Sequence, residues 1–480
     1  MQALIAIPPD QSPDLTHSRV AGLPLLERLL LALREKGVER VQLLCPRTPD
    51  AYRRGLRPAG ALGLDLDWHG PDTPLAELLD QLERGPGPTV MLASDVVFEH
   101  GLLGALLGAP SGRPSALVVD RPAGRLDGLS LVRGVTSAGS RADGLVDVCR
   151  TARITAGLFL VPEPGHLLTL VEPDAAGDAS LAEQVIGRLQ AGLAESAERG
   201  RLELLPATAG FWAPLRDRTD VAPAERGLFN TLRKSTDGFI SRNLNRPLSL
   251  AMSKVLIRLP IHPNVLTLFS LLVGLASAWF AAQGGYWPVA VGAALLQFNS
   301  ILDGCDGEIA RLRYQTSKLG SLLDTIVDNV STTGFIVGVV IGLWRGHGGW
   351  LVPAAAGLFL ALIAVAFALM LFFLLRYGQT ASLIAFFRPL VQSIERSRSW
   401  AGSVGRVMAK VLKRDSHVFI LFLVGLAGQA WLILALADFA ALVLTSVILY
   451  LVIGRRRWLI AALAADSGNY GVAEGDLVRG

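Results

Sequence analysis

The pattern of hydrophobic and polar positions changes near residue 220. Before that point, short apolar runs of strand length alternate with segments whose apolar residues recur every three or four positions. After residue 262, the apolar runs lengthen toward the ~20 residues that a helix needs to cross a bilayer. The pattern therefore predicts a soluble α/β part followed by an all-α membrane part.

The soluble part reads as alternating strands and helices. The apolar segments that define them are residues 3–7, 23–36, 41–45, 75–82, 90–97, 115–119, 129–132, 157–161 and 181–189. Alternation at these lengths predicts an α/β sandwich of the Rossmann type with a largely parallel sheet over residues 1–222. Ligands of such folds bind at the carboxyl ends of the strands.

The membrane part, residues 263–457, contains six apolar stretches and is followed by a tail over residues 458–480. These stretches are residues 265–282, 287–302, 319–344, 350–375, 418–436 and 439–453. The four longer ones suit a transmembrane helix, and the two shorter ones span only if their polar ends are included. The pattern predicts a six-helix transmembrane domain.

Basic residues set the expected orientation of these helices. They gather before the first stretch, between the second and third, between the fourth and fifth, and after the sixth, whereas only Arg345 lies on the opposite side. The positive-inside rule then places both termini in the cytoplasm of a multi-pass inner (plasma) membrane protein.

Composition agrees with this division. Only 18% of the residues are charged and the mean hydropathy is +0.43, which excludes a single soluble domain of 480 residues. The N-terminal run 3–7 is too short for a secretory signal and has no basic flank. Cys45, Cys149 and Cys305 lack a C-x-x-C pairing, so neither a disulfide framework nor a zinc site is expected. Because the basic residues flank apolar segments, we expect no nucleic-acid partner.

A basic segment over residues 223–262 joins the two parts. Apolar residues recur in it at helical spacing, which predicts one interfacial helix over 225–260 lying on anionic lipid. The alternative is an anchor without a role in substrate binding. The basic residues Lys234, Arg242 and Arg246, together with Arg388, suit a phosphorylated acceptor, and they suit anchoring equally well.

Four aspartates stand where the second stretch ends and the third begins. Asp303 and Asp306 are three residues apart, and Asp324 and Asp328 are four apart, so each pair shares one helical face. Asp324 and Asp328 lie about 6–12 Å into their helix from Gly320, at the end that faces the cytoplasm. Two such faces would gather negative charge that requires cations, and oxygen-only ligands favour Mg²⁺ or Mn²⁺. Buried salt bridges are the alternative, with Arg311 as the cation of the motif.

These residues carry a resemblance. The run Asp303-x2-Asp306-Gly307-x2-Ala310-Arg311-x8-Gly320-x3-Asp324-x3-Asp328 resembles the complete signature of the CDP-alcohol phosphotransferase family. Pro263-Asn264-x2-Thr267 resembles an element that the family has at the start of its first membrane helix. The resemblance implies transfer of a phosphoalcohol from a CDP-alcohol to an acceptor alcohol, with release of CMP.

The resemblance also implies roles for individual residues. Asp303, Asp306, Asp324 and Asp328 would hold two Mg²⁺ or Mn²⁺ ions, and Asp328 would also accept the proton of the acceptor hydroxyl. A further set would bind the cytidine diphosphate: Asn264, Thr267, Gly307, Ala310, Arg311 and Gly320. The implied partners are a CDP-alcohol donor, either CDP-diacylglycerol or CDP-inositol, a polar alcohol acceptor, the lipid bilayer and a second copy of the chain in a homodimer.

Three polar residues near the aspartates have two possible roles. Gln297, Asn299 and Asn329 are expected either to orient the carboxylates or to hydrogen-bond between helices without a catalytic role. Two other functions remain as alternatives to the transferase: a cation-coupled transporter, which predicts internal repeats that the sequence lacks, and a scaffold without activity.

The soluble part resembles sugar-nucleotide nucleotidyltransferases. Residues 22–28 are similar to the opening of that family's first long helix, and residues 93–98 to the strand that carries its metal-binding aspartate. Asp95 stands at that position, but we favour an ordinary residue at the end of a strand over a metal ligand. The family's Gly-rich loop with Arg and Lys is replaced by residues 8–13, without a lysine before Lys36, and Arg218 stands where a second acid is expected. We therefore expect a degenerate domain that does not transfer nucleotides.

The order of the two parts resembles a narrower group. Lys234-x2-Asp237-Gly238-x2-Ser241-Arg242-x2-Asn245-Arg246-x2-Ser249 is similar to the junction of bifunctional proteins that join inositol-1-phosphate cytidylyltransferase to di-myo-inositol-phosphate phosphate synthase. The resemblance implies an inositol phosphate acceptor. It also leaves open a bifunctional enzyme whose soluble part makes the CDP-alcohol from CTP.

Overall fold

The chain forms two compact units, each of which is described by itself. The computed structural model describes residues 1–9, 11–85, 87–108, 115–120, 153–161, 185, 203–206, 210–233, 237–377, 414–457 and 459–460. The first unit comprises Met1–Leu232 with Leu312–Tyr314, and the second comprises Arg233–Arg311 with Gln315–Gly480. The strand expected at 129–132, the helix expected at 181–189 except Val185, and the site residues Lys234 and Arg388 lie outside the described residues.

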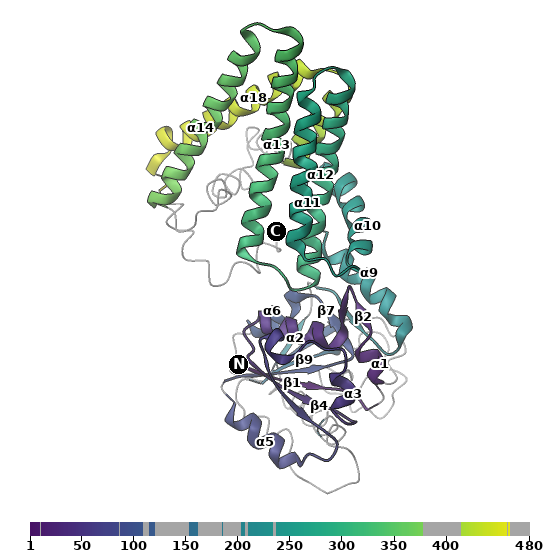
Figure 1. Cartoon of the computed structure of the whole chain (residues 1–480). Coiled ribbons are helices and arrows are strands. Elements are labelled where there is room, and N and C mark those ends of the chain that lie inside the picture. Colours follow the sequence, from purple (N-terminus) through teal and green to yellow (C-terminus); the bar gives the residue numbers. More distant parts are fainter. Residues whose placement is uncertain are drawn as a thin grey trace. The chain divides into compact units, whose positions relative to one another are not determined.

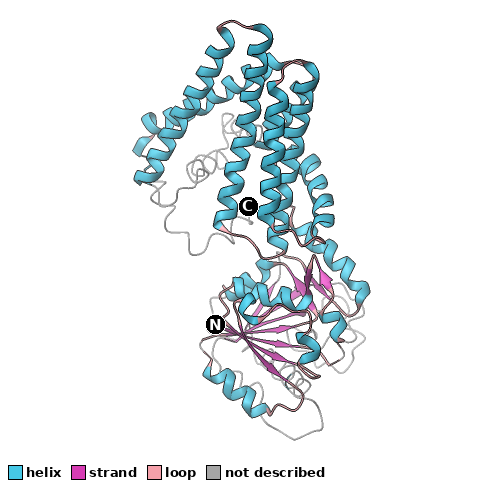
Figure 2. Ribbon diagram, in the orientation of Figure 1, coloured by secondary structure: helices cyan, strands magenta, loops and turns pink. Residues whose placement is uncertain are grey.

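The first unit is built on a seven-stranded sheet with helices packed against it (Figures 1 and 2). Its strands stand in the order β10-β8-β9-β6-β1-β4-β5. Their bounds are β1 Gln2–Ala6, β4 Arg40–Leu44, β5 Asp65–His69, β6 Thr89–Ala93, β8 Ser115–Asp120, β9 Arg153–Val161 and β10 Glu203–Pro206. All neighbouring strands are parallel except β9, which is antiparallel to β6 and to β8. The predicted α/β fold with a largely parallel sheet is confirmed.

Amphipathic helices cover this sheet because their apolar stripes face it. In α2 (Leu25–Glu35) every residue from Leu25 to Leu33 is buried, while α5 (Leu75–Arg84) buries only Leu78 and Leu82. Apart from α9 (Val221–Thr231), the other described helices and turns of this unit are short: α1 Pro13–Thr16, α3 Asp50–Arg53, α4 Ala59–Leu62, α6 His100–Leu107 and η1 Arg218–Asp220. Two small antiparallel pairs complete it: β2 Arg19–Val20 with β3 Leu23–Pro24, and β7 Val96–Phe98 with β11 Trp212–Pro214.

The strand predicted over residues 90–97 is interrupted. Strand β6 ends at Ala93, and β7 leaves the large sheet to pair with β11. The interruption falls at the carboxyl ends of β1 and β6, where the chain order along the sheet reverses direction. At this point, where α/β folds bind ligands, the buried side chain of Gln11 accepts a hydrogen bond from Ser94.

The single interfacial helix predicted over residues 225–260 is wrong. Helix α9 (Val221–Thr231) buries Leu228 and Phe229 in the first unit, where it contacts β2 and β11. The second unit begins with a short π-helical turn, η2 (Ser241–Asn245), which continues into α10 (Arg246–Leu256). The apolar residues of this stretch thus pack in two different units. The sequence did not reveal this, because the residues recur at the same helical spacing in both helices.

The second unit is helical, with α11, α12 and α13 running side by side (Figure 1). The long helices among its described residues are α11 Pro263–Ala282, α12 Tyr286–Leu312, α13 Lys318–His347, α14 Leu351–Tyr377, α17 Arg414–Leu426 and α18 Ala430–Leu449, which continues into η3 Tyr450–Gly454. Four of the described segments are long and apolar enough to cross a membrane: Pro263–Ala282, Leu319–His347, Leu351–Phe373 and Ala430–Gly454. The predicted membrane part is therefore supported, whereas the count of six spanning helices stays a prediction.

The predicted boundaries of the last two apolar stretches are wrong. The sequence pattern placed the break between residues 436 and 439, but α17 ends at Leu426 and α18 begins at Ala430. Gly428 forms the turn with a φ of 70°, and a Cβ at this position would lie 2.7 Å from the ring of Tyr286. A glycine at positive φ ends the helix here although apolar residues continue on both sides.

Small residues allow close packing between α11 and α13. A Cβ added at Gly338 of α13 would overlap the carbonyl oxygen of Ala278 on α11, and one at Gly342 would lie 2.6 Å from the carbonyl oxygen of Ala281. Membrane helices associate through such small residues because lipid provides no hydrophobic drive between them. This packing brings the N-terminal ends of α11 and α13 close to each other, since Asn264 Oδ1 would lie 3.5 Å from a Cβ at Gly320.

Candidate active site

Two helices supply the four aspartates of the motif. Asp303 and Asp306 lie on α12, one turn apart, and Asp324 and Asp328 lie on α13. Helix α13 begins where the hydroxyl of Ser317 accepts a hydrogen bond from the amide of Gly320, at 2.9 Å. This cap fixes the start of α13 and therefore the register in which Asp324 and Asp328 face α12.

Three of the aspartates converge on one point. One carboxylate oxygen from each of Asp303, Asp324 and Asp328 lies within 4.8 Å of the other two. Asp306 stands outside this group of three and is buried, and its carboxylate accepts a hydrogen bond from the hydroxyl of Thr267 on α11. The expected gathering of acids from α12 and α13 is thus present, with Asp306 held by a third helix.

An arginine that the sequence analysis did not select lies among these acids. The Nη1 atom of Arg414, at the start of α17, is 2.9 Å from Asp303 Oδ2 and is also ion-paired with Asp328. Arg414 lies 111 residues from Asp303 in the chain, so no local spacing connects the two. A salt bridge of the kind considered as the alternative to a metal site is therefore present, but it is only partly buried and has Arg414 in place of Arg311.

The residues predicted to bind cytidine diphosphate come from the same three helices. Asn264 and Thr267 lie on the first turns of α11, Gly307, Ala310 and Arg311 on the last turns of α12, and Gly320 on the first turn of α13. Gly307 leaves space beside Arg311, whose Nη1 would be 3.7 Å from a Cβ at that position. The helix ends that carry these residues adjoin the aspartates, which is the arrangement the motif predicts.

The basic residues predicted to bind the acceptor have different surroundings. Arg242 is exposed, but Arg246 is directed into the protein, where its Nε and Nη2 each donate to Asp237 at 3.1 Å. Its Nη1 donates to Glu308 on α12 at 2.8 Å. Burial disfavours the charge on Arg246, but these two carboxylates outweigh it and raise the pKa of the guanidinium above its usual value. Arg246 therefore holds α10 to α12.

Glu308 lies at the centre of the contact between α10 and α12. The sequence pattern did not predict this role. Its carboxylate is fully buried and also accepts hydrogen bonds from Ser249 Oγ at 2.6 Å and Ser253 Oγ at 2.7 Å. A Cβ at Gly304 would lie 3.0 Å from Ser249, so the glycine permits α10 to approach α12 closely. The only sequence signal was an ionisable residue inside an apolar helix, one position after Gly307.

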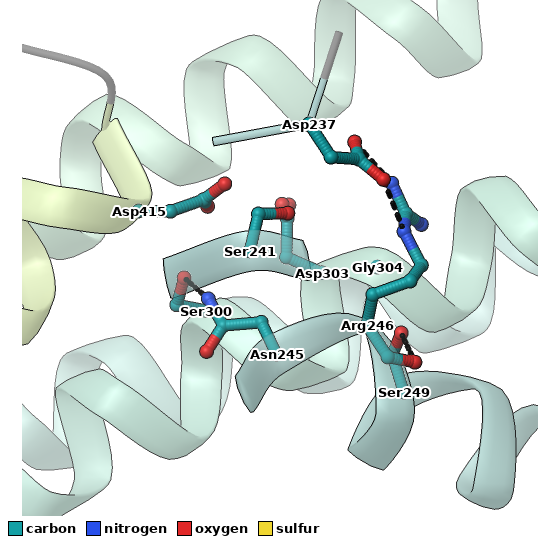
Figure 3. Close-up of a pocket in the computed structure, with 9 residues that line it drawn as sticks. All are labelled: Asp237, Ser241, Asn245, Arg246, Ser249, Ser300, Asp303, Gly304 and Asp415. Carbon is teal, nitrogen blue, oxygen red and sulfur yellow. Dashed lines mark hydrogen bonds and ion pairs between the residues drawn. The ribbon is translucent and has the colours of Figure 1, made fainter. Parts of the chain in front are cut away.

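A polar cavity of about 140 Å³ lies between α10, α12 and α17 (Figure 3). It is lined by Asp237, Ser241, Asn245, Arg246, Ser249, Ser300, Asp303, Gly304 and Asp415. Asp303 is common to this cavity and to the group of three carboxylates. A molecule in the cavity would therefore lie beside the acidic cluster.

Two of the polar residues considered as partners of the aspartates connect helices to one another. Gln297 Nε2 donates to Asn245 Oδ1 at 2.8 Å, and Asn299 Oδ1 accepts from Ser270 Oγ at 2.6 Å. Asn329 Nδ2 donates to the carbonyl oxygen of Thr325 in its own helix. The structure thus favours the helix-packing role for the first two residues.

The donor set fits a hard divalent cation. Buried oxygens of Asp324 and Asp328, the Oδ1 atom of each, have no hydrogen-bond partner in the described part of the chain. A buried carboxylate oxygen without a partner is costly, and a Mg²⁺ or Mn²⁺ ion would satisfy it. Asp303, Asp324 and Asp328 are therefore the residues that would hold a metal, with Asp306 beside them.

Comparison with known proteins identifies a family domain in the second unit. Residues 260–389 match the family model described as CDP-alcohol phosphatidyltransferase. This range contains the whole aspartate motif on α12 and α13. The second unit contains a CDP-alcohol phosphotransferase domain.

Two relatives of this domain carry the name "Bifunctional IPC transferase and DIPP synthase". The one from Aquifex aeolicus is 38% identical over 152 residues, which cover 32% of this chain and 34% of that protein. The one from Thermococcus kodakarensis is 27% identical over 338 residues, 66% of this chain and 69% of that protein. The chain thus aligns with about a third of the Aquifex protein, and over a longer range at lower identity with the Thermococcus protein.

Among solved structures, the inositol-1-phosphate CTP transferase from T. maritima is similar over 47% of this chain and 94% of its own. The TM-score is 0.34 and the sequence identity 14%.

Proposed function

We propose that the CDP-alcohol phosphotransferase domain moves a phosphoalcohol from a CDP-alcohol to a polar acceptor alcohol and releases CMP. The observation that carries this proposal is the convergence of Asp303, Asp324 and Asp328 from two helices within 4.8 Å. Two divalent cations, Mg²⁺ or Mn²⁺, would be held there, and they would neutralise the diphosphate and stabilise its negative charge as the bond breaks. The assignment of Asp306 to the metals rests on the motif.

The reaction requires one proton transfer, which we assign to Asp328. The acceptor oxygen attacks the phosphorus distal to cytidine and forms a new P–O bond, while the P–O bond to CMP breaks and CMP leaves with the electron pair. The proton of the acceptor hydroxyl passes to the Asp328 carboxylate. Asn264, Thr267, Gly307, Ala310, Arg311 and Gly320 would bind the cytidine diphosphate from the ends of α11, α12 and α13.

The cavity beside Asp303 is our proposed acceptor site. Its serine hydroxyls, asparagine amide and carboxylates match a ligand with several hydroxyl groups, such as inositol or an inositol phosphate. Arg246 does not supply a free guanidinium there, because Asp237 and Glu308 bind it. Any phosphate of the acceptor would instead be bound by other basic residues, for which we propose Arg242, Lys234 and Arg388.

We propose that the first unit does not make the donor. The loop after β1 has no lysine, and at the carboxyl ends of β1 and β6 the buried Gln11 is hydrogen-bonded to Ser94. The donor, CDP-diacylglycerol or CDP-inositol, would then come from another enzyme. Incubation of the purified protein with CTP and inositol phosphate tests this directly, because release of diphosphate would show a bifunctional enzyme.

The membrane arrangement is proposed on the distribution of basic residues. We place the protein in the inner membrane with both termini on the cytoplasmic side, so that the aspartate site opens to the cytoplasm. We also expect the protein to form a homodimer. Accessibility of cysteines introduced at Arg345 and at Arg455 to a membrane-impermeant reagent in intact cells tests the orientation.

One experiment tests the reaction itself. The purified protein is incubated with CDP-diacylglycerol and CDP-inositol in parallel, each with inositol and inositol phosphate, and CMP and the products are identified by mass. EDTA should stop CMP release, and Mg²⁺ or Mn²⁺ should restore it. Asp328→Asn should abolish it, whereas Asp438→Asn, the same change in α18, should not. Full activity of Asp328→Asn would contradict the proposed mechanism.

A further inference from the structure

Among the described residues, Arg414 is ion-paired with two of the three converging carboxylates. Its Nη1 is 2.9 Å from Asp303 Oδ2 and is also ion-paired with Asp328, while Asp324 completes the group. The side chain is 24% exposed, so solvent screens these contacts only in part. The residue lies outside the matched range 260–389 and outside the eight-residue motif.

The positive guanidinium of Arg414 reduces the repulsion among the negatively charged carboxylates. Three carboxylates within 4.8 Å repel one another, and a positive charge in contact with two of them reduces this repulsion. A divalent cation held by the same carboxylates would do so more completely, because it carries two charges and approaches its ligand oxygens to about 2.0–2.1 Å. Both cations therefore depend on the same carboxylates.

We infer that Arg414 and the divalent cation compete for Asp303 and Asp328. The inference rests on the proposed function, since it takes the carboxylates to be metal ligands. When no divalent cation is bound, we expect the guanidinium to remain paired with these two acids. Metal binding requires the guanidinium to move away from Asp328, because two cations bound to one carboxylate repel each other.

The remaining donors of Arg414 indicate what it contacts after it moves. Its Nε and Nη2 atoms are buried and have no hydrogen-bond partner within the part of the chain that the structure describes. A guanidinium with unused donors binds an oxyanion well, and a substrate of this reaction brings phosphate oxygens to the same place. Arg414 thus exchanges a carboxylate partner for a phosphate partner when metal and substrate bind.

Binding of Mn²⁺, followed by electron paramagnetic resonance without any substrate, tests the competition. If Arg414 occupies the site for about nine-tenths of the time, its removal tightens the apparent affinity about tenfold. Arg414→Gln should therefore bind Mn²⁺ about tenfold more tightly than the natural protein. Arg258→Gln, which removes the same charge from an exposed position after α10, should leave the affinity unchanged. Equal or weaker binding by Arg414→Gln would overturn the inference.

A second measurement uses the natural protein and does not depend on whether the variant folds. Phenylglyoxal modifies guanidinium groups, and mass spectrometry of the peptide that contains Arg414 reports its rate. Mn²⁺ should raise that rate several-fold over EDTA, and an unchanged or lower rate would contradict the competition.

Absence of any Mn²⁺ binding to the natural protein would overturn the proposed metal site itself, and equal binding by natural protein and variant would overturn only the role of Arg414.

Discussion

The hydroxyl of Thr267 on α11 donates a hydrogen bond to the carboxylate of Asp306 on α12, and the same hydroxyl is 3.3 Å from the carbonyl oxygen of Pro263. Asp306 is buried and stands beside the group of three converging carboxylates. This bond fixes the orientation of an acid that the motif assigns to metal binding. Thr267 would thus act on the proposed metal site through Asp306.

Loss of this bond should weaken metal binding. Thr267→Val keeps the shape of the side chain and removes its donor, and loss of such a supporting contact commonly lowers metal affinity 10–100-fold. We expect the Mn²⁺ concentration that gives half-maximal CMP release to rise about tenfold. Thr267→Ser should behave as the natural protein. Thr445→Val is the control: it removes a hydroxyl that donates to the carbonyl oxygens of Ala441 in α18 and Leu362 in α14, and it should leave the metal dependence unchanged.

The contact between Glu308 and Arg246 should be important for stability. Removal of one partner of a buried ion pair leaves an uncompensated charge and typically costs about 3–5 kcal/mol. Glu308→Gln and Arg246→Met should each lower the free energy of unfolding by about 3 kcal/mol, measured by denaturation in detergent. The double variant should lose clearly less than the sum of the two, because the single changes remove the same interaction.

The exposed Arg258 provides the comparison for this pair. Arg258→Met should change the free energy of unfolding by less than about 0.5 kcal/mol, as expected of a surface position. Strictly additive losses for Glu308→Gln and Arg246→Met would show that the two side chains do not support each other, and that α10 is held to α12 by its serines and apolar residues instead.

The sequence predicted the part of the site that depends on local spacing. Asp303 and Asp306, and likewise Asp324 and Asp328, share helical faces because three and four residues complete about one turn. Arg414 was missed because it joins Asp303 across 111 residues, a separation over which no periodicity carries information. Glu308 was missed because it occupies a variable position of the motif, and its three partners lie on a different helix.

The fold shows the same limit. Strands such as β1 and β4 were predicted because their residues are mostly apolar and almost all buried. Strand β5 was missed because it lies at the edge of the sheet and carries Asp65 and Asp67, whose charges are compensated by Arg40 on the neighbouring strand. The boundary between α17 and α18 was misplaced because a single glycine, Gly428, ends a helix inside a continuous apolar run.

The stability of β4 and β5 should depend on pH through His69. Burial lowers the pKa of His69, although Asp67 and Glu77 oppose the effect, and its Nε2 contacts Gln42 Oε1. Because the pKa is lower in the folded than in the unfolded chain, the unfolded chain binds the proton more readily below about pH 6.5. The stabilisation is therefore complete above that pH and declines as the pH falls below it.

Hydrogen exchange of the full-length protein, followed by mass spectrometry of peptides from β4 and β5, measures this dependence. After correction for intrinsic exchange, protection should decrease between pH 7.5 and pH 5.5 in the natural protein and remain nearly constant in His69→Gln. His347→Gln, which changes a histidine of α13, should keep the decrease. An equal decrease in His69→Gln would assign the pH dependence to other groups.

Two glycines of α13 should respond in opposite ways to the same substitution. At Gly338 an added methyl group would overlap the carbonyl oxygen of Ala278 on α11, whereas at Gly346 it would meet no atom within 4 Å. Gly338→Ala should force α11 and α13 apart and lower the free energy of unfolding by about 1–3 kcal/mol. Gly346→Ala should raise it by up to about 1 kcal/mol, because alanine favours the helical backbone.

Thermal unfolding in detergent measures both, and a similar shift for the two variants would show that close contact between α11 and α13 does not limit stability. Since α11 carries Thr267 and α13 carries Asp324 and Asp328, Gly338→Ala should also reduce CMP release, while Gly346→Ala should leave it unchanged.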